Sequence, residues 1–128
     1  MNAQTDAAQR LYDAFAARDP QAILASLHPE FVGEVSAGMP LGVGGRHEGP
    51  EAMLRDVWAQ VFAHYEMSVE AEELLPSGLD RVVAIGHYRG SERESGHEVE
   101  ASFAHVLVIS DDRIVSLNQI TDTARWTA

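Results

Sequence analysis

The side chains that could do chemistry in this sequence are carboxylates, imidazoles, phenols, hydroxyls, amides and guanidinium groups. The chain has 20 acidic residues, six histidines and nine basic residues, and every basic residue is arginine. It contains no cysteine and no lysine, which excludes thiol nucleophiles, disulfides, thiolate metal sites, lysine Schiff bases and phosphate-loop lysines. Acid–base work by carboxylates and imidazoles is therefore the first interpretation.

The histidines also raise the question of a metal site. No H-x-H or H-E-x-x-H pair occurs, and the neighbourhoods of His64 and His97 add only isolated acidic residues. Because metal sites need several ligands at characteristic spacings, we expect no metal ion.

Three helices are expected to position these side chains. The first helix ends near Arg18, Asp19-Pro20 begins a short second one, and a third runs from Pro50 to about His64;. Apolar residues recur at helical spacing on the first and third helices. These faces carry four aromatic residues, Tyr12, Phe15, Trp58 and Phe62.

The rest of the chain is expected to form strands. A short extended run is followed by a glycine-rich segment, which we predict to be a loop, and four further strands follow the third helix. The predicted strands cover residues 30–35, 67–72, 81–89, 97–109 and 114–121, and the loop covers residues 37–49. The order predicts one α+β domain over residues 1–128, with helices on one face of a curved antiparallel sheet.

The net charge excludes some partners. At pH 7 the formal charge is −11 and the isoelectric point is near 4.8, so the protein's field repels phosphate backbones and anionic lipids. No apolar run approaches the ~20 residues of a membrane span, and the N-terminus has no signal-like segment. We expect a soluble cytoplasmic protein that binds neither nucleic acid nor membranes.

The order of elements resembles the nuclear transport factor 2-like fold. The run Leu11-Tyr12-Asp13-Ala14-Phe15 before Arg18-Asp19 is similar to the opening helix of its SnoaL-like and ketosteroid-isomerase-like branches. Gly49-Pro50-Glu51-Ala52-Met53 is similar to their third-helix start, and Phe103 to Asp122 is similar to their closing hairpin. The resemblance implies a cone-shaped fold, in which a curved antiparallel sheet wraps on three N-terminal helices around a pocket.

The catalytic acids of these families do not carry over to this chain. The isomerase's tyrosine, general base and oxyanion-stabilising aspartate correspond to Leu11, Val35 and Ala104. The working aspartate of the cyclases and of limonene-epoxide-hydrolase-like members corresponds to Gln119, and the hydrolase's Arg and Asp correspond to Ser102 and Ala104. An amide orients a water or a carbonyl but exchanges no proton near neutral pH, so steroid isomerisation and epoxide opening are disfavoured.

Strand parity decides which side chains face the pocket, because a shift of one residue moves the whole set to the other face. On the parity that the resemblance implies, the inward residues are Tyr88, Ser102, Ala104, Val106, Leu117, Gln119 and Thr121. His87 and His105 then point outward with Phe103, Leu107 and Ile109, an apolar face that predicts a homodimer through the sheet. The opposite parity turns both histidines inward, with Asp122 near the mouth, as a base and its orienter.

Two functions follow as hypotheses. In the first, the chain binds a small apolar molecule, and the resemblance implies cofactor-free isomerase, cyclase or hydratase chemistry on a polyketide- or steroid-like carbonyl compound. The expected ligand-binding residues are Tyr12, Phe15, Trp58, Phe62, Tyr88, Ser102 and Gln119, and the catalytic candidates are Gln119, Tyr88, Glu34, His105 and Asp122. In the second, the chain is a non-catalytic binding or dimeric assembly domain, which the missing family acids favour.

Overall fold

The computed structural model describes residues 2–127 and begins with two helices. Helix α1 (Ala3–Ala17) is capped by the side chain of Asn2 and ends where Arg18 adopts a left-handed conformation, with φ 53°. Helix α2 (Pro20–Ala25) is capped by the Asp19 carboxylate. Both caps satisfy amide groups that the first helical turn leaves without partners.

The predicted helix over residues 50–64 is one helical run with a wider turn in its middle. Helix α3 (Pro50–Met53) passes into a π-helical turn, η2 (Leu54–Trp58), and then into α4 (Ala59–His64). Such wider turns are rare in proteins, and those that occur often lie at functional sites. Within residues 2–127, no helix combines the length and the apolar character that a membrane crossing requires.

Six strands form one sheet in the order β2-β1-β6-β5-β4-β3. All neighbouring strands are antiparallel except β1 and β6, which are parallel. The strands are β1 (Leu27–Val35), β2 (Gly45–Glu48), β3 (Tyr65–Ser77), β4 (Arg81–Glu92), β5 (Glu98–Ser110) and β6 (Arg113–Thr121). The α+β class is confirmed, whereas the loop prediction is wrong for Gly45–Glu48, which pairs with β1 as an edge strand.

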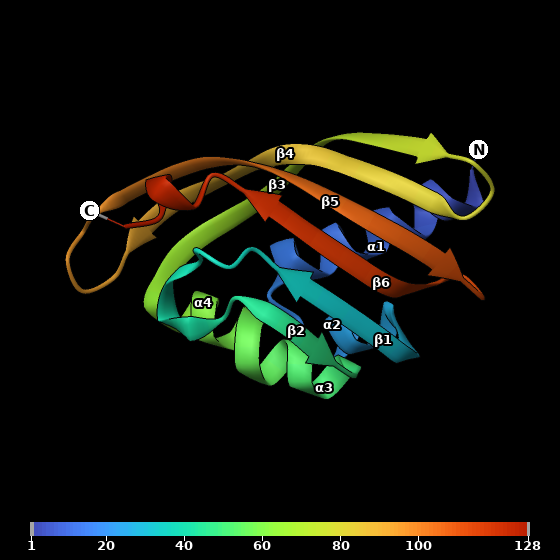
Figure 1. Ribbon diagram of the computed structural model, residues 1–128, viewed down its shortest axis with the longest axis horizontal. Helices are drawn as coiled ribbons and strands as arrows, with labels where there is room; N and C mark the ends of the chain where they lie inside the picture. The colour runs from blue at the N-terminus through green and yellow to red at the C-terminus, as the bar shows by residue number, and fades with distance from the viewer. Residues whose placement is uncertain (1, 128) are drawn as a thin grey trace.

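The helices lie under the concave side of the curved sheet, and the long strands β3 to β6 arch over them (Figure 1). The core fills the space between the two layers, where Leu11 and Phe15 of α1 and Val57 of η2 are buried. Two aromatic side chains, Tyr65 at the start of β3 and Trp126 beyond β6, are also buried. This arrangement encloses the concave face on which a site would lie.

The parity expected for β5 is wrong, and the inward side chains are those of the opposite parity. Phe103 and His105 are buried on the concave side, whereas Ser102 is exposed on the convex side. The sequence of the first half of β5 indicated the correct parity. Glu98 and Glu100 lie on the same face as Ser102, and carboxylates face solvent on a half-buried sheet;. The parity expected for β4 and β6 is correct, because Tyr88, Leu117 and Gln119 are buried.

The curvature of the sheet depends on close contact between β3 and β4. At Gly86 an added Cβ would overlap the carbonyl oxygen of Glu70, and at Gly90 it would overlap that of Glu66. A bulge in β3 between Ala71 and Glu73 lies beside the first of these positions. Bulges and glycines allow strands to bend strongly, so both features curl the sheet around the interior.

Replacing Gly86 with alanine is expected to lower the free energy of unfolding by roughly 3 kcal/mol or more, because backbone and not a flexible side chain must move. Urea unfolding monitored by circular dichroism measures this change. The control Ser102→Ala, on the exposed face of the adjoining strand, is expected to change stability by less than about 0.5 kcal/mol. Equal stability of the two variants would contradict the account of curvature.

Candidate active site

A small cavity lies between the concave side of the sheet and the helical run over residues 50–64. Its volume is about 30 Å³, which is room for one or two water molecules. Its wall is mostly apolar and aromatic, and its polar groups all come from β4, β5 and β6. The lining residues are Phe15, Met39, Val57, Trp58, Val61, Phe62, Met67, Val69, Tyr88, His105, Gln119 and Trp126.

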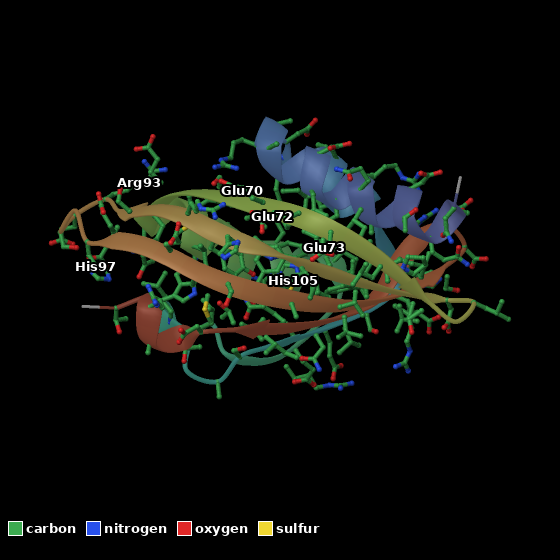
Figure 2. All side chains as sticks on the ribbon, turned by 90° about the horizontal axis from the view of Figure 1, so that it is seen from above. Glu70, Glu72, Glu73, Arg93, His97 and His105 are labelled. Carbon is green, nitrogen blue, oxygen red and sulfur yellow. The ribbon has the colours of Figure 1, made fainter. Side chains whose placement is uncertain are left out.

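The polar floor of the cavity is a buried imidazole held between two phenols. The hydroxyl of Tyr12 lies 2.7 Å from Nδ1 of His105, and the hydroxyl of Tyr88 lies 2.6 Å from Nε2. The ring of Phe103 stacks on the imidazole with a centroid separation of 4.1 Å. Figure 2 shows His105 midway along the sheet, far from His97 at its end. The imidazole is thus shielded from water and bonded through both nitrogens.

The hydrogen-bonding partners leave one hydroxyl proton free. Gln119 Oε1 accepts from the backbone N–H of Ser36 at 3.1 Å, so its amide nitrogen donates to the Tyr88 oxygen at 3.0 Å. Neutral imidazole has one N–H and one bare nitrogen. When Nε2 of His105 carries the hydrogen, Tyr88 accepts two bonds and its own proton is free to enter the cavity. In the other tautomer the free proton belongs to Tyr12, which does not line the cavity.

Burial keeps all three ring groups uncharged. Desolvation lowers the pKa of His105 from 6.5 to about 3. Desolvation also raises the pKa of Tyr88 far above its usual value, and desolvation followed by the proximity of Tyr88 raises the pKa of Tyr12. A charged form would lose its hydration without gaining a counter-ion. The cluster is therefore a neutral hydrogen-bonding network at physiological pH.

Such a network suits the stabilisation of a ligand oxygen better than proton abstraction. A general base works best when its pKa is near the working pH, and the pKa of His105 lies far below it. Preorganised neutral donors in a water-poor cavity stabilise developing negative charge on oxygen. When Nε2 of His105 carries the hydrogen, Tyr88 and the second amide hydrogen of Gln119 are donors at the floor of the cavity.

Five of the expected ligand-binding residues line the cavity. They are Phe15, Trp58, Phe62, Tyr88 and Gln119. Tyr12 lies behind this wall and reaches the site only through His105. The structure thus brings together aromatic residues from the helices and polar residues from the strands, as the resemblance implied.

Other candidates lie outside the cavity. Ser102 and Asp122 are exposed and border a shallow surface depression with His87 on the convex side. Glu34 is exposed on β1 and lies 3.5 Å from Arg46 of β2. His87 bonds to Glu72 through Nδ1 at 2.8 Å. The expected outward orientation is therefore correct for His87, whereas the alternative inward orientation is correct for His105.

Trp126 and Met39 are lining residues that sequence reasoning missed. Trp126 follows the last predicted strand, and Met39 lies within the glycine-rich segment, where no periodicity indicates a buried face. An isolated tryptophan two positions before the last residue was the available signal, since large aromatics seldom stay exposed.

The arrangement matches a known family. A sequence profile of the SnoaL-like domain matches residues 8–117. This chain belongs to the SnoaL-like family. The resemblance inferred from its helix and hairpin motifs is confirmed. A search of curated proteins found no match.

Solved structures share the fold of this SnoaL-like domain over nearly its whole length. A nuclear transport factor 2-like protein of unknown function from Burkholderia pseudomallei is 29% identical, with a TM-score of 0.88 and 100% of both chains covered. TerC, co-crystallised with polyporic acid, is 26% identical, with a TM-score of 0.85, covering 96% of this chain and 94% of its own. A candidate polyketide cyclase from Sinorhizobium meliloti is 26% identical, with a TM-score of 0.68 and coverages of 90% and 94%.

The lowered pKa of His105 predicts a loss of stability in mild acid. Below pH 6.5 the unfolded chain protonates this imidazole while the folded protein does not, so the stability present above pH 6.5 is lost as the pH falls toward 3;. Between pH 7.5 and 5.5 the loss from this group is about 1 kcal/mol. Urea unfolding at both pH values measures it.

The variant His105→Gln separates this effect from other titrations, because it keeps every other ionisable group. We expect its stability to fall less than that of the unchanged protein over the same pH interval, whatever its absolute stability. Equal losses in both proteins would show that His105 is not the group responsible.

Proposed function

We propose that this SnoaL-like domain binds a small, largely apolar molecule through a carbonyl oxygen. The observation that carries the proposal is the pair of neutral donors, Tyr88 and Gln119, at the floor of an aromatic cavity. Their positions are held by His105 and by the backbone of Ser36. A few well-placed polar groups in an apolar wall are typical of small-molecule sites.

The aromatic wall favours a flat ligand. Phe15 and Trp58 meet edge to face with centroids 5.0 Å apart, and Tyr88 and Trp126 meet in the same way at 5.0 Å. Aromatic rings gain further stabilisation from such contacts beyond their burial. The relative that was co-crystallised with polyporic acid and the candidate polyketide cyclase support this ligand class.

As an enzyme, the domain would act without a cofactor on a carbonyl compound, as an isomerase, cyclase or hydratase. Tyr88 and Gln119 would hold the oxygen on which negative charge develops, an effect worth roughly 3 to 4 kcal/mol for one such donor in a well-studied hydrolase. Within residues 2–127, no carboxylate lines the cavity, so the proton would have to move through water or through the ligand's own groups.

The alternative function is non-catalytic binding or assembly. The small volume of the cavity, about 30 Å³, favours it, because this space holds no ligand until side chains move;. In this case the network between Tyr12, His105 and Tyr88 would serve only to join α1 to the sheet.

A matched pair of ligands tests the carbonyl contact. α-Tetralone and tetralin have the same ring skeleton and differ in the carbonyl oxygen. We expect calorimetry to show that Tyr88→Phe weakens α-tetralone binding about tenfold, since one hydrogen bond to the ligand is lost. Tetralin binding is expected to stay within about twofold.

Equal weakening for both ligands would mean that the variant disturbs the wall and not a specific bond. An unchanged affinity for α-tetralone would exclude Tyr88 as the anchor. Absence of binding by α-tetralone, tetralin and polyporic acid to the unchanged protein would overturn the ligand-binding function and favour assembly.

We further propose that the chain forms a homodimer through the convex face of the sheet. The apolar residues there differ from those first expected, because the parity of β5 is reversed. Ile85 of β4, Ala104 of β5 and Ile120 of β6 lie in register across three strands, and Ile120 is 53% exposed. An apolar surface that spans several strands is typical of an interface.

Replacing Val106 with aspartate would place a carboxylate in the middle of this face, and we expect it to shift the protein from dimer to monomer. Light scattering coupled to size exclusion at micromolar concentration measures the mass. The control Gln9→Glu adds the same charge on the exposed side of α1 and is expected to leave the mass unchanged. A monomeric unchanged protein would contradict the proposal directly.

A further inference from the structure

Trp126 is buried in the cavity wall although it lies almost at the end of the chain. Its side chain is 1% exposed and is the largest among the fully buried ones. Its ring stands edge-on to Tyr88, with centroids 5.0 Å apart, and edge-on to Tyr65, with centroids 5.3 Å apart. The ring thus covers the phenol that offers a proton to the ligand.

Trp126 is the one buried residue of the segment over residues 122–127. Its neighbours Ala124, Arg125 and Thr127 are exposed, and the short turn η3 (Thr123–Arg125) buries none of its residues. The indole nitrogen donates to Thr121 Oγ1 at 3.3 Å, near the upper limit for such a bond;. Besides the ring, the Thr123 side chain lies close to Gly38, and the Asp122 N–H donates to the carbonyl oxygen of Ser102 at 3.4 Å.

A further polar contact of this segment, with Tyr65 of β3, is also long. The hydroxyl of Tyr65 donates to the carbonyl oxygen of Trp126 at 3.3 Å. By comparison, Phe15 lies within the long helix α1, and Tyr88 and His105 lie on interior strands paired on both sides. Trp126, like Met39 of the glycine-rich segment, can therefore leave the cavity wall without breaking a helix or a strand pairing.

The size of the cavity requires some group to move. Ligand pockets commonly measure ~300 to 1,000 Å³, whereas this one measures about 30 Å³. A two- or three-ring molecule therefore needs space that side chains now occupy. An indole ring beside the Tyr88 donor already fills a volume of the right shape for a flat aromatic ligand.

We propose that Trp126 is a plug that occupies the ligand's place and determines the size of ligand that the domain accepts. This inference rests on the proposed function and extends it. A flat carbonyl compound displaces the indole, packs edge to face with Tyr88 or Tyr65, and brings its oxygen to the Tyr88 and Gln119 donors. Apparent affinity is reduced by the fraction of molecules that keep the plug in place, and a larger ligand requires its complete displacement.

Removing the plug should change ligand preference in a defined direction. We expect Trp126→Ala to bind the three-ring ketone 9-fluorenone at least tenfold more tightly than the unchanged protein, because the space is already open. The affinity for two-ring α-tetralone should change less. Calorimetry with both ketones gives the ratio of the affinities for 9-fluorenone and α-tetralone. Trp126→Phe keeps an aromatic contact with Tyr65 and should give an intermediate ratio. It replaces the alanine variant if that variant does not fold.

Fluorine NMR tests displacement in the chain with its own plug. Trp58 and Trp126 are the two tryptophans of the sequence, so protein labelled with 5-fluorotryptophan gives two signals, which Trp58→Phe assigns. The H₂O/D₂O isotope shift reports solvent contact of each ring. We expect the Trp126 signal to lack this shift in the free protein and to gain it when 9-fluorenone saturates the site.

Each outcome decides between the two proposals. A Trp126 signal that stays without an isotope shift in the saturated complex, or equal affinity of the alanine variant and the unchanged protein for 9-fluorenone, overturns the plug and leaves ligand binding standing. Failure of the unchanged protein and of Trp126→Ala to bind either ketone overturns ligand binding and the plug together. Tighter binding with a gained isotope shift supports both.

Discussion

The pairing of a buried imidazole with two phenols is the constraint on which the interior depends. Tyr12 comes from α1, Tyr88 from β4 and His105 from β5, so the bonds at 2.7 and 2.6 Å join the first helix to the middle of the sheet. A buried polar group without a partner costs ~1 to 3 kcal/mol. The distance between the layers is therefore set by polar contacts as well as by packing, and the cavity lies beside the point where it is set.

Charge is kept away from this interior. On the convex face Arg89 contacts Glu70, Glu72 and Glu100, and these bonds raise the pKa of the arginine above its usual value. Figure 2 shows Glu70 and Glu72 together along β3. The acidic residues that dominate the composition thus lie in water, where repulsion is screened. Among the described residues that line the cavity, the side-chain donors and acceptors are neutral, which directs any chemistry there toward hydrogen bonding to oxygen.

Sequence patterns predicted the elements of this fold better than the faces of its strands. Apolar spacing located the helices, and counting along β6 correctly turned Gln119 inward. The same counting failed for β5, although the exposed residues Glu98, Glu100 and Ser102 alternate with buried ones and mark the outward face of that strand;. The residue type of Trp126 indicated burial, but its place in the cavity wall could not be predicted, since its contacts with Tyr88 and Tyr65 join segments far apart in the chain.

The histidine at the centre of β5 breaks the apolar alternation of the inward residues, and this exception is what distinguishes a site from a core. Leucine or valine in place of His105 would fill the same layer without polar groups, and Tyr12 and Tyr88 would each lose a hydrogen-bond partner. Sequences usually depart from locally consistent patterns where function requires it. The proposed displacement of the Trp126 indole would make this polar floor compatible with a well-packed interior. The donors would stay covered until a ligand oxygen accepted their hydrogen bonds.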